Sequence, residues 1–78
     1  MADTTTIEPP WDALSPIELR VVRLGLAFNI DLGTVADRLR LGIRTVSRYR
    51  SSIVAKLGAP DFEHVLRRAF AENLEPER

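Results

Sequence analysis

Hydrophobic residues between positions 34 and 58 recur at helical spacing and predict two helices separated by a tight turn. On a wheel of about 100° per residue, the second helix, from Ile43 to Leu57, has an inner side that carries Val46, Arg50, Ile53 and Leu57. Its opposite side is small, hydroxylated or cationic, and carries Arg44, Ser47, Arg48, Ser51 and Ala55. The helix is therefore predicted to pack by one side and to present the other for recognition.

The shorter helix before it has an apolar side formed by Val35, Ala36 and Leu39. The small side chain of Ala36 allows a crossing helix to approach closely. In the connection, residues 40–42, we expect Leu41 to plug the core and Gly42 to relax the backbone at the corner. Gly58 is expected to end the longer helix in the left-handed conformation. This arrangement is typical of a helix-turn-helix motif.

Two further helices flank the motif. Ser15 and Glu18 form a capping box with Pro16 at the first helical position, and apolar residues then continue to about Phe28. This first helix has more apolar positions than a single stripe holds, so part of its surface is predicted to meet a partner. The last helix is expected to start at Pro60, with the acids Asp61 and Glu63 at its positive end. Its apolar stripe consists of Phe62, Val65, Leu66, Ala69, Phe70 and Leu74. The predicted fold class is all-α with four helices.

The four helices define one small domain, residues 14–74. Residues 1–13 contain a run of threonines and a double proline but few apolar side chains, so we expect a flexible N-terminal arm. Within it, Trp11 is expected to cover the end of the first helix rather than to stack on a ligand. Residues 75–78 are expected to form a charged C-terminal tail broken by Pro76.

The formal net charge is 0, but the charges are unevenly distributed. Between Arg38 and Pro60 there are six basic residues and no acidic residue. The basic residues are Arg38, Arg40, Arg44, Arg48, Arg50 and Lys56. The rest of the chain carries five bases against eleven acids, a formal charge of −6. Such polarity would direct one side of the protein toward phosphate. The alternative is that these basic residues only form a solvent-exposed helix face and bind no partner.

No pattern of residues indicates catalysis. The serines have no general base placed beside them by a motif, and the chain has no Gly-rich phosphate loop. With no cysteine and only one histidine, His64, we expect neither a metal site nor a cofactor. The lack of cysteine is compatible with a reducing cytoplasm, where we expect the protein. The apolar run at residues 21–30 is short and contains Arg23, so no membrane span is expected.

Taken together, these residues resemble the LuxR-type, or GerE-like, DNA-binding domain. The resemblance covers about residues 14–74, and the matching pieces are Ser15-Pro16-Ile17-Glu18, Val35-Ala36-Asp37-Arg38-Leu39, Arg44-Thr45-Val46, Ile53 and Lys56-Leu57-Gly58. It implies a four-helix domain whose third helix enters the major groove. It also implies that phosphate is contacted by Thr45, Arg50 and Lys56, and that bases are faced by Ser47, Arg48 and Ser51. From their own positions we add Arg44 to the base-facing set and Arg40, at the turn, to the phosphate-facing set.

The leading hypothesis is a sequence-specific transcriptional regulator that binds double-stranded DNA as a homodimer. In domains of this type the fourth helix often forms the dimer contact, and Val65 and Ala69 are the candidates here. The alternative is a helix-turn-helix protein-interaction module that contacts RNA polymerase or another regulator. The neutral net charge favours the alternative, whereas the arginines around the recognition helix favour DNA.

Overall fold

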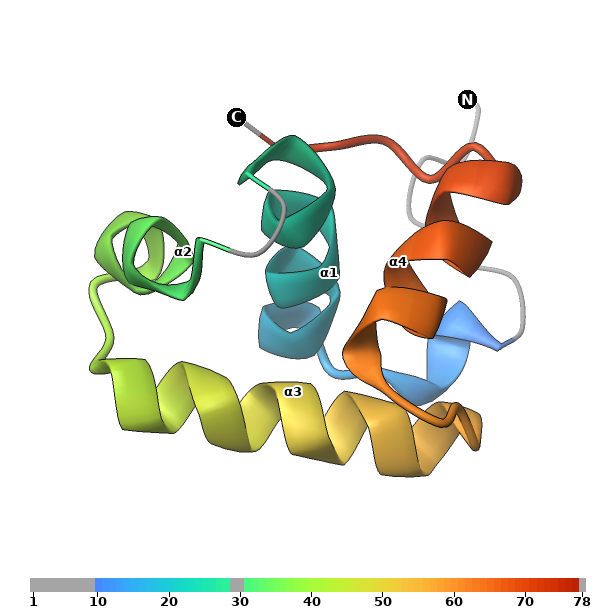
Figure 1. Cartoon of the computed structure of the whole chain (residues 1–78), viewed down its shortest axis with the longest axis horizontal. Helices are drawn as coiled ribbons and strands as arrows, with labels where there is room; N and C mark the ends of the chain where they lie inside the picture. Colours follow the sequence, from blue (N-terminus) through green and yellow to red (C-terminus); the bar gives the residue numbers. More distant parts are fainter. Residues whose placement is uncertain (1–9, 29–30, 78) are drawn as a thin grey trace.

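A computed structural model describes residues 10–28 and 31–77 of the chain. In these residues it is all-helical and has no strand: a short 3-10 helix, η1 (Trp11–Ala13), precedes α1 (Pro16–Phe28), α2 (Leu32–Leu39), α3 (Ile43–Leu57) and α4 (Phe62–Ala71). Helices α1, α2 and α4 lie on one side of α3, with α1 between the other two (Figure 1). The predicted all-α class with four α-helices is confirmed.

The first helix is central, and its position explains its many apolar residues. It packs against each of α2, α3 and α4. Val21, Val22 and Leu24 are at most 1% exposed, and Gly25 is buried with them. A Cβ at Gly25 would lie 3.0 Å from Leu66 Cδ2, so the glycine lets α4 approach closely. These residues are covered within the protomer, and the prediction that the excess apolar surface of this helix meets a partner is wrong for them.

The connection between α2 and α3 has the expected shape, but a different residue lies at its corner. Val35, Ala36 and Val46 are buried at the crossing of α2 and α3, and Leu41 packs against the same core. The left-handed residue is Arg40, at φ 58°, and not Gly42, which is extended and precedes α3. Helix α2 ends in a Schellman motif at Arg40, since the amides of residues 40 and 41 donate to the carbonyls of residues 37 and 36. The prediction that Gly42 relaxes the corner is therefore wrong.

The other helix ends agree with the sequence in part, because α4 begins at Phe62 and not at Pro60, and it ends at Ala71, before Leu74. Asp31 accepts a hydrogen bond from the backbone of Thr34 at the start of α2, and Asp61 accepts one from His64 at the start of α4. Gly58 ends α3 at φ 64°, as expected. These local signals set the lengths of α2, α3 and α4 and hence the positions of the residues on them.

The folded unit extends beyond residues 14–74 at both ends. Trp11 is only 4% exposed and its indole Nε1 donates to Glu72 Oε1 at 2.9 Å. At the other end, the Glu77 amide donates to the Arg23 carbonyl at 3.0 Å, and the Glu77 carboxylate pairs with Arg20. Residues 11–13 and 75–77 are thus not an arm and a tail but are bound to the helices. The predicted arm at residues 1–9 lies outside the described residues.

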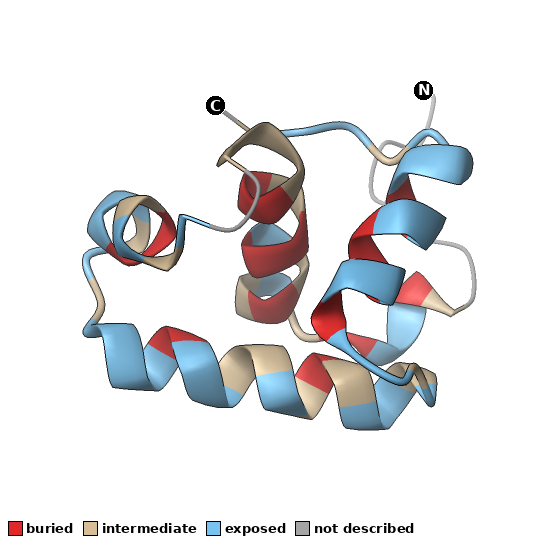
Figure 2. Cartoon of the chain, viewed as in Figure 1, coloured by how far each residue is buried: buried red, intermediate tan, exposed pale blue. Residues whose placement is uncertain are grey.

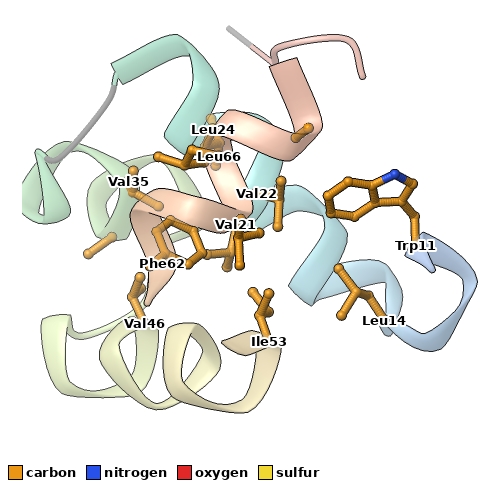
Figure 3. Packing of buried hydrophobic residues seen from close by; sticks show 13 residues of the cluster. Trp11, Leu14, Val21, Val22, Leu24, Val35, Val46, Ile53, Phe62 and Leu66 are labelled. Atoms are coloured by element: carbon orange, nitrogen blue, oxygen red, sulfur yellow. The ribbon is translucent and has the colours of Figure 1, made fainter. Parts of the chain in front are cut away.

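The core is a single cluster to which all four helices contribute. Figure 2 shows the buried positions on the sides of α1, α3 and α4 that face inward, and Figure 3 shows their side chains converging. Val46 and Ile53 of α3 are 0% exposed, which fixes the rotation of this helix about its axis. Among the described residues, no helix has the length and apolar character needed to cross a membrane.

Candidate nucleic-acid interface

The outer side of α3 carries the residues predicted to face bases. All four of these residues are exposed and lie at helical spacing i, i+3, i+4 and i+7; they are Arg44, Ser47, Arg48 and Ser51. Burial of Val46 and Ile53 on the opposite side holds them outward. The side of α3 turned away from the other helices is largely exposed along its length (Figure 2). The predicted exposure of the four residues is confirmed, whereas their contact with bases stays a prediction.

The cations around this surface are not neutralised by the protein itself. Within residues 10–28 and 31–77, none of Arg38, Arg40, Arg44, Arg48 and Arg50 forms an ion pair. Arginines elsewhere do: Arg20 pairs with Glu77, Arg67 with Glu63, and Arg68 with Glu72. The cause lies in the sequence, because no acid occurs between residues 38 and 60. Their charge is thus available to an anionic partner.

Arg50 occupies a defined position at the edge of the surface. Its guanidinium carbon lies 4.5 Å from the centre of the Phe62 ring, a cation–π arrangement between α3 and the start of α4. Beside it is an open depression of about 320 Å³, lined by Ser47, Arg50, Ser51, Val54 and Phe62. The depression brings a guanidinium and two hydroxyl groups together, a donor set that suits a phosphate group.

The turn places two more of the predicted phosphate contacts. Arg40 is exposed in the left-handed conformation, which costs an arginine about 1 kcal/mol or more relative to glycine. Thr45 is exposed in the first turn of α3. The turn between α2 and α3 thus carries a cation at a position where glycine would be more stable.

Lys56, another of the predicted phosphate contacts, forms an ion pair within the protein. Its ammonium donates to Glu18 Oε1 at 2.7 Å, so it is paired with a carboxylate of α1. Glu18 is 3% exposed and needs this cation, because a buried carboxylate without a partner is strongly destabilising. Lys56 therefore joins α3 to α1; its side chain is 41% exposed, but because its charge is already paired we no longer expect it to bind phosphate.

The predicted dimer-contact residues are also wrong. Val65 is 1% exposed and Ala69 is 0% exposed, both inside the protomer, because this side of α4 packs on α1 and α3. The exposed large side chain on α4 is Phe70, at 78%. It lines an open depression together with Leu26 and Leu74, at the ends of α1 and α4 that point away from α3 (Figure 1).

Two other exposed residues have no role in the interface predicted from the sequence. Arg38 is exposed, and its guanidinium carbon lies 4.8 Å from the centre of the Phe28 ring. Ile43, the first residue of α3, is 54% exposed. The signal for Arg38 was its place in the acid-free segment. The signal for Ile43 was its position at the start of the helix, where on a wheel of about 100° per residue it lies between Arg50 and Ser47, at the border of the apolar side.

In the described part of the chain, no three His, Cys, Asp or Glu residues come together as a metal site would require. His64 lies with its Nδ1 3.2 Å from Asp61 Oδ1, at the start of α4. The backbone hydrogen bond from His64, together with its side chain, lowers the pKa of Asp61.

Comparisons with protein-family models, curated proteins and solved structures find no match to this chain.

Proposed function

We propose that this protein is a sequence-specific DNA-binding transcriptional regulator of the LuxR/GerE type, in which α2 and α3 form the helix-turn-helix and α3 enters the major groove. The observation that carries the proposal is the outer side of α3. It is exposed, it combines arginine with serine, and its cations have no carboxylate partner within the described residues. The major groove admits one helix and presents acceptors on guanine that arginine reads in pairs.

The proposed role of each residue follows from its place, either on the outer side of α3 or at the edges of that side. Arg44, Ser47, Arg48 and Ser51 point outward and would read base edges. Phosphates would be bound at the flanks by Arg40 and Thr45 near the turn, and by Arg50 beside Phe62. No enzymatic step, metal or cofactor is part of this proposal.

We propose that the protein binds as a homodimer through the surface around Phe70. This surface lies at the ends of α1 and α4 away from α3, so contact there would leave both recognition helices free (Figure 1). A two-fold dimer presents the same helix to each half-site, so the preferred DNA would be approximately palindromic.

Binding of a random-sequence duplex at about 50 and about 200 mM salt tests the proposal. Each phosphate contact contributes about 0.9 to the slope of log affinity against log salt, so at least about tenfold weaker binding is expected at the higher concentration. Arg44→Ala should weaken binding. Arg67→Ala is the matched control, because it removes the same charge from α4, where Arg67 is paired with Glu63.

Absence of salt-dependent binding would refute DNA binding, and equal effects of the two variants would refute the role of the outer side of α3 in it. Absence of such binding would favour the alternative, a helix-turn-helix module that contacts RNA polymerase or another regulator. That alternative would use the exposed Phe70 rather than the arginines of α3.

A further inference from the structure

Ile43 is an apolar side chain in an unexpected place. The described residues contain two exposed large hydrophobic side chains, Phe70 on α4 and Ile43, which is 54% exposed. Ile43 is the first residue of α3 and lies directly before Arg44, one turn ahead of Ser47. An apolar group therefore stands at the N-terminal end of the surface proposed to read bases.

The fold gives no evident reason for this side chain. The buried contacts of α3 are supplied by Val46 and Ile53, which are 0% exposed, while Ile43 is not part of the core cluster or of the hydrophobic residues packed against it. As the first helical residue it provides no side-chain cap. An isoleucine side chain that is exposed to this extent contributes little to folding stability.

The surroundings of Ile43 are open. A Cβ built at the preceding Gly42 would have no heavy atom within 4 Å, so the start of α3 is not overhung by other parts of the described chain. Arg40 and Arg44 flank it, and no acid lies between residues 38 and 60. A single apolar group within a cationic surface is complementary to a nucleic acid groove, which carries phosphates on both edges, rather than to an apolar protein surface.

We infer that Ile43 is a specificity-determining residue that contacts the 5-methyl group of a thymine in the major groove. The inference rests on the proposed function and specifies part of its sequence preference. Thymine is the base that presents an apolar group in the major groove, and apolar side chains are its partners there. The first residues of a recognition helix are those that reach base edges.

Replacement of thymine by uracil tests this directly, because the two bases differ only by that methyl group. A preferred duplex is first selected from a random pool with the parent protein, and each thymine is then replaced singly by deoxyuridine. At one or two positions the parent should bind about fourfold more weakly, the effect expected for burial of one methyl group. Ile43→Ala should bind the thymine and uracil duplexes within about twofold of each other at those positions.

Ile17→Ala is the matched control, since it removes the same atoms from α1, where Ile17 is half-buried and lies outside the core cluster, and it should preserve the parent's thymine preference. A melting curve of Ile43→Ala that matches the parent's would show that its loss of discrimination does not come from unfolding. If the parent binds duplex DNA but discriminates no thymine from uracil, or if Ile43→Ala discriminates as the parent does, the inference is overturned and the proposed function stands. If the parent binds no duplex, the proposed function itself fails.

Discussion

The Lys56 ammonium donates a hydrogen bond of 2.7 Å to Glu18 Oε1, which ties the last turn of α3 to the first turn of α1. The same carboxylate oxygen accepts from the Ser15 amide at 2.8 Å, and the other oxygen accepts from the Ser52 hydroxyl at 2.7 Å. The capping box of α1 therefore also fixes the C-terminal half of α3. The orientation of α3 thus depends on a buried carboxylate that lies away from the proposed DNA surface.

This contact predicts acid sensitivity. Burial alone would raise the pKa of Glu18, but hydrogen bonds from Lys56, Ser15 and Ser52 outweigh it and lower the pKa from 4.5 to about 2. A carboxylate with a lower pKa in the folded state stabilises the fold above its unfolded pKa, and this stability is lost as the pH falls from about 4.5 toward 2. We expect a loss of about 2 kcal/mol from this group between pH 7 and pH 3.

Glu18→Gln provides the comparison, because glutamine does not titrate. Urea unfolding at pH 7 should show a less stable variant, and the gap between parent and variant should narrow by about 2 kcal/mol at pH 3. Other carboxylates with lowered pKa values, such as Asp31 and Asp61, are present in both proteins and cancel in the difference. A gap that is constant with pH would show that Glu18 does not titrate in this range.

Lys56→Ala should affect stability more than DNA binding. It leaves the buried Glu18 carboxylate with hydrogen bonds from Ser15 and Ser52 but without its cation, at a cost of about 1 to 3 kcal/mol. Measured at a temperature where the variant is fully folded, the slope of log affinity against log salt should equal the parent's. A slope lower by about one unit would restore Lys56 to the phosphate contacts.

Short-range signals in the sequence predicted much of the fold. The capping box at Ser15 and Glu18 and the stop at Gly58 each act within one helical turn, and each forms as expected. The outward side of α3 could also be predicted, because the helical period of 3.6 residues places these positions on the side opposite buried Val46.

Predictions that depended on tertiary contacts were less accurate. A helix wheel shows that Val65 and Ala69 are apolar but not that α1 and α3 cover them completely. Likewise, Lys56 has the same sequence spacing whether it faces solvent or α1, and only packing brings it to Glu18. The left-handed residue of the turn depended on where α2 ends, so Arg40 could not be distinguished from Gly42 by composition.

Arg40→Gly should raise stability and lower DNA affinity together. Glycine adopts the positive φ of 58° without the steric cost, so the free energy of unfolding should rise by about 1 kcal/mol. Loss of the cation should weaken binding to all duplexes and reduce the salt slope by about one unit. Asn73→Gly is the control, since Asn73 also has a positive φ, of 62°, at the end of α4. The control should gain stability with an unchanged slope; an unchanged slope in Arg40→Gly as well would remove Arg40 from the interface.

Arg48→Ala should relax base preference without destabilising the protein. Arg48 is exposed on the outer side of α3 and forms no ion pair with the described residues, so its loss leaves no buried group unsatisfied. On a preferred duplex the expected cost is about 1 to 3 kcal/mol, with a smaller loss on random sequence. Fluorescence anisotropy with both duplexes measures the difference, and Arg67→Ala serves as the charge-matched control. Equal losses on the two duplexes would assign Arg48 to phosphate rather than to bases.

Phe70→Glu should dissociate the homodimer without unfolding the protomer. Phe70 is 78% exposed and contributes nothing to the buried core, whereas Val65, at 1% exposed, is part of it. Light scattering should give twice the protomer mass for the parent and the protomer mass for Phe70→Glu, with similar melting temperatures. Val65→Glu should instead lose its cooperative melt, because it buries an unpaired charge.

Phe70→Glu should also bind a palindromic site more weakly than the parent does, and should bind an isolated half-site as tightly as the parent does. A parent of protomer mass at the concentrations used for DNA binding, with equal affinity for both duplexes, would show that the protein acts as a monomer.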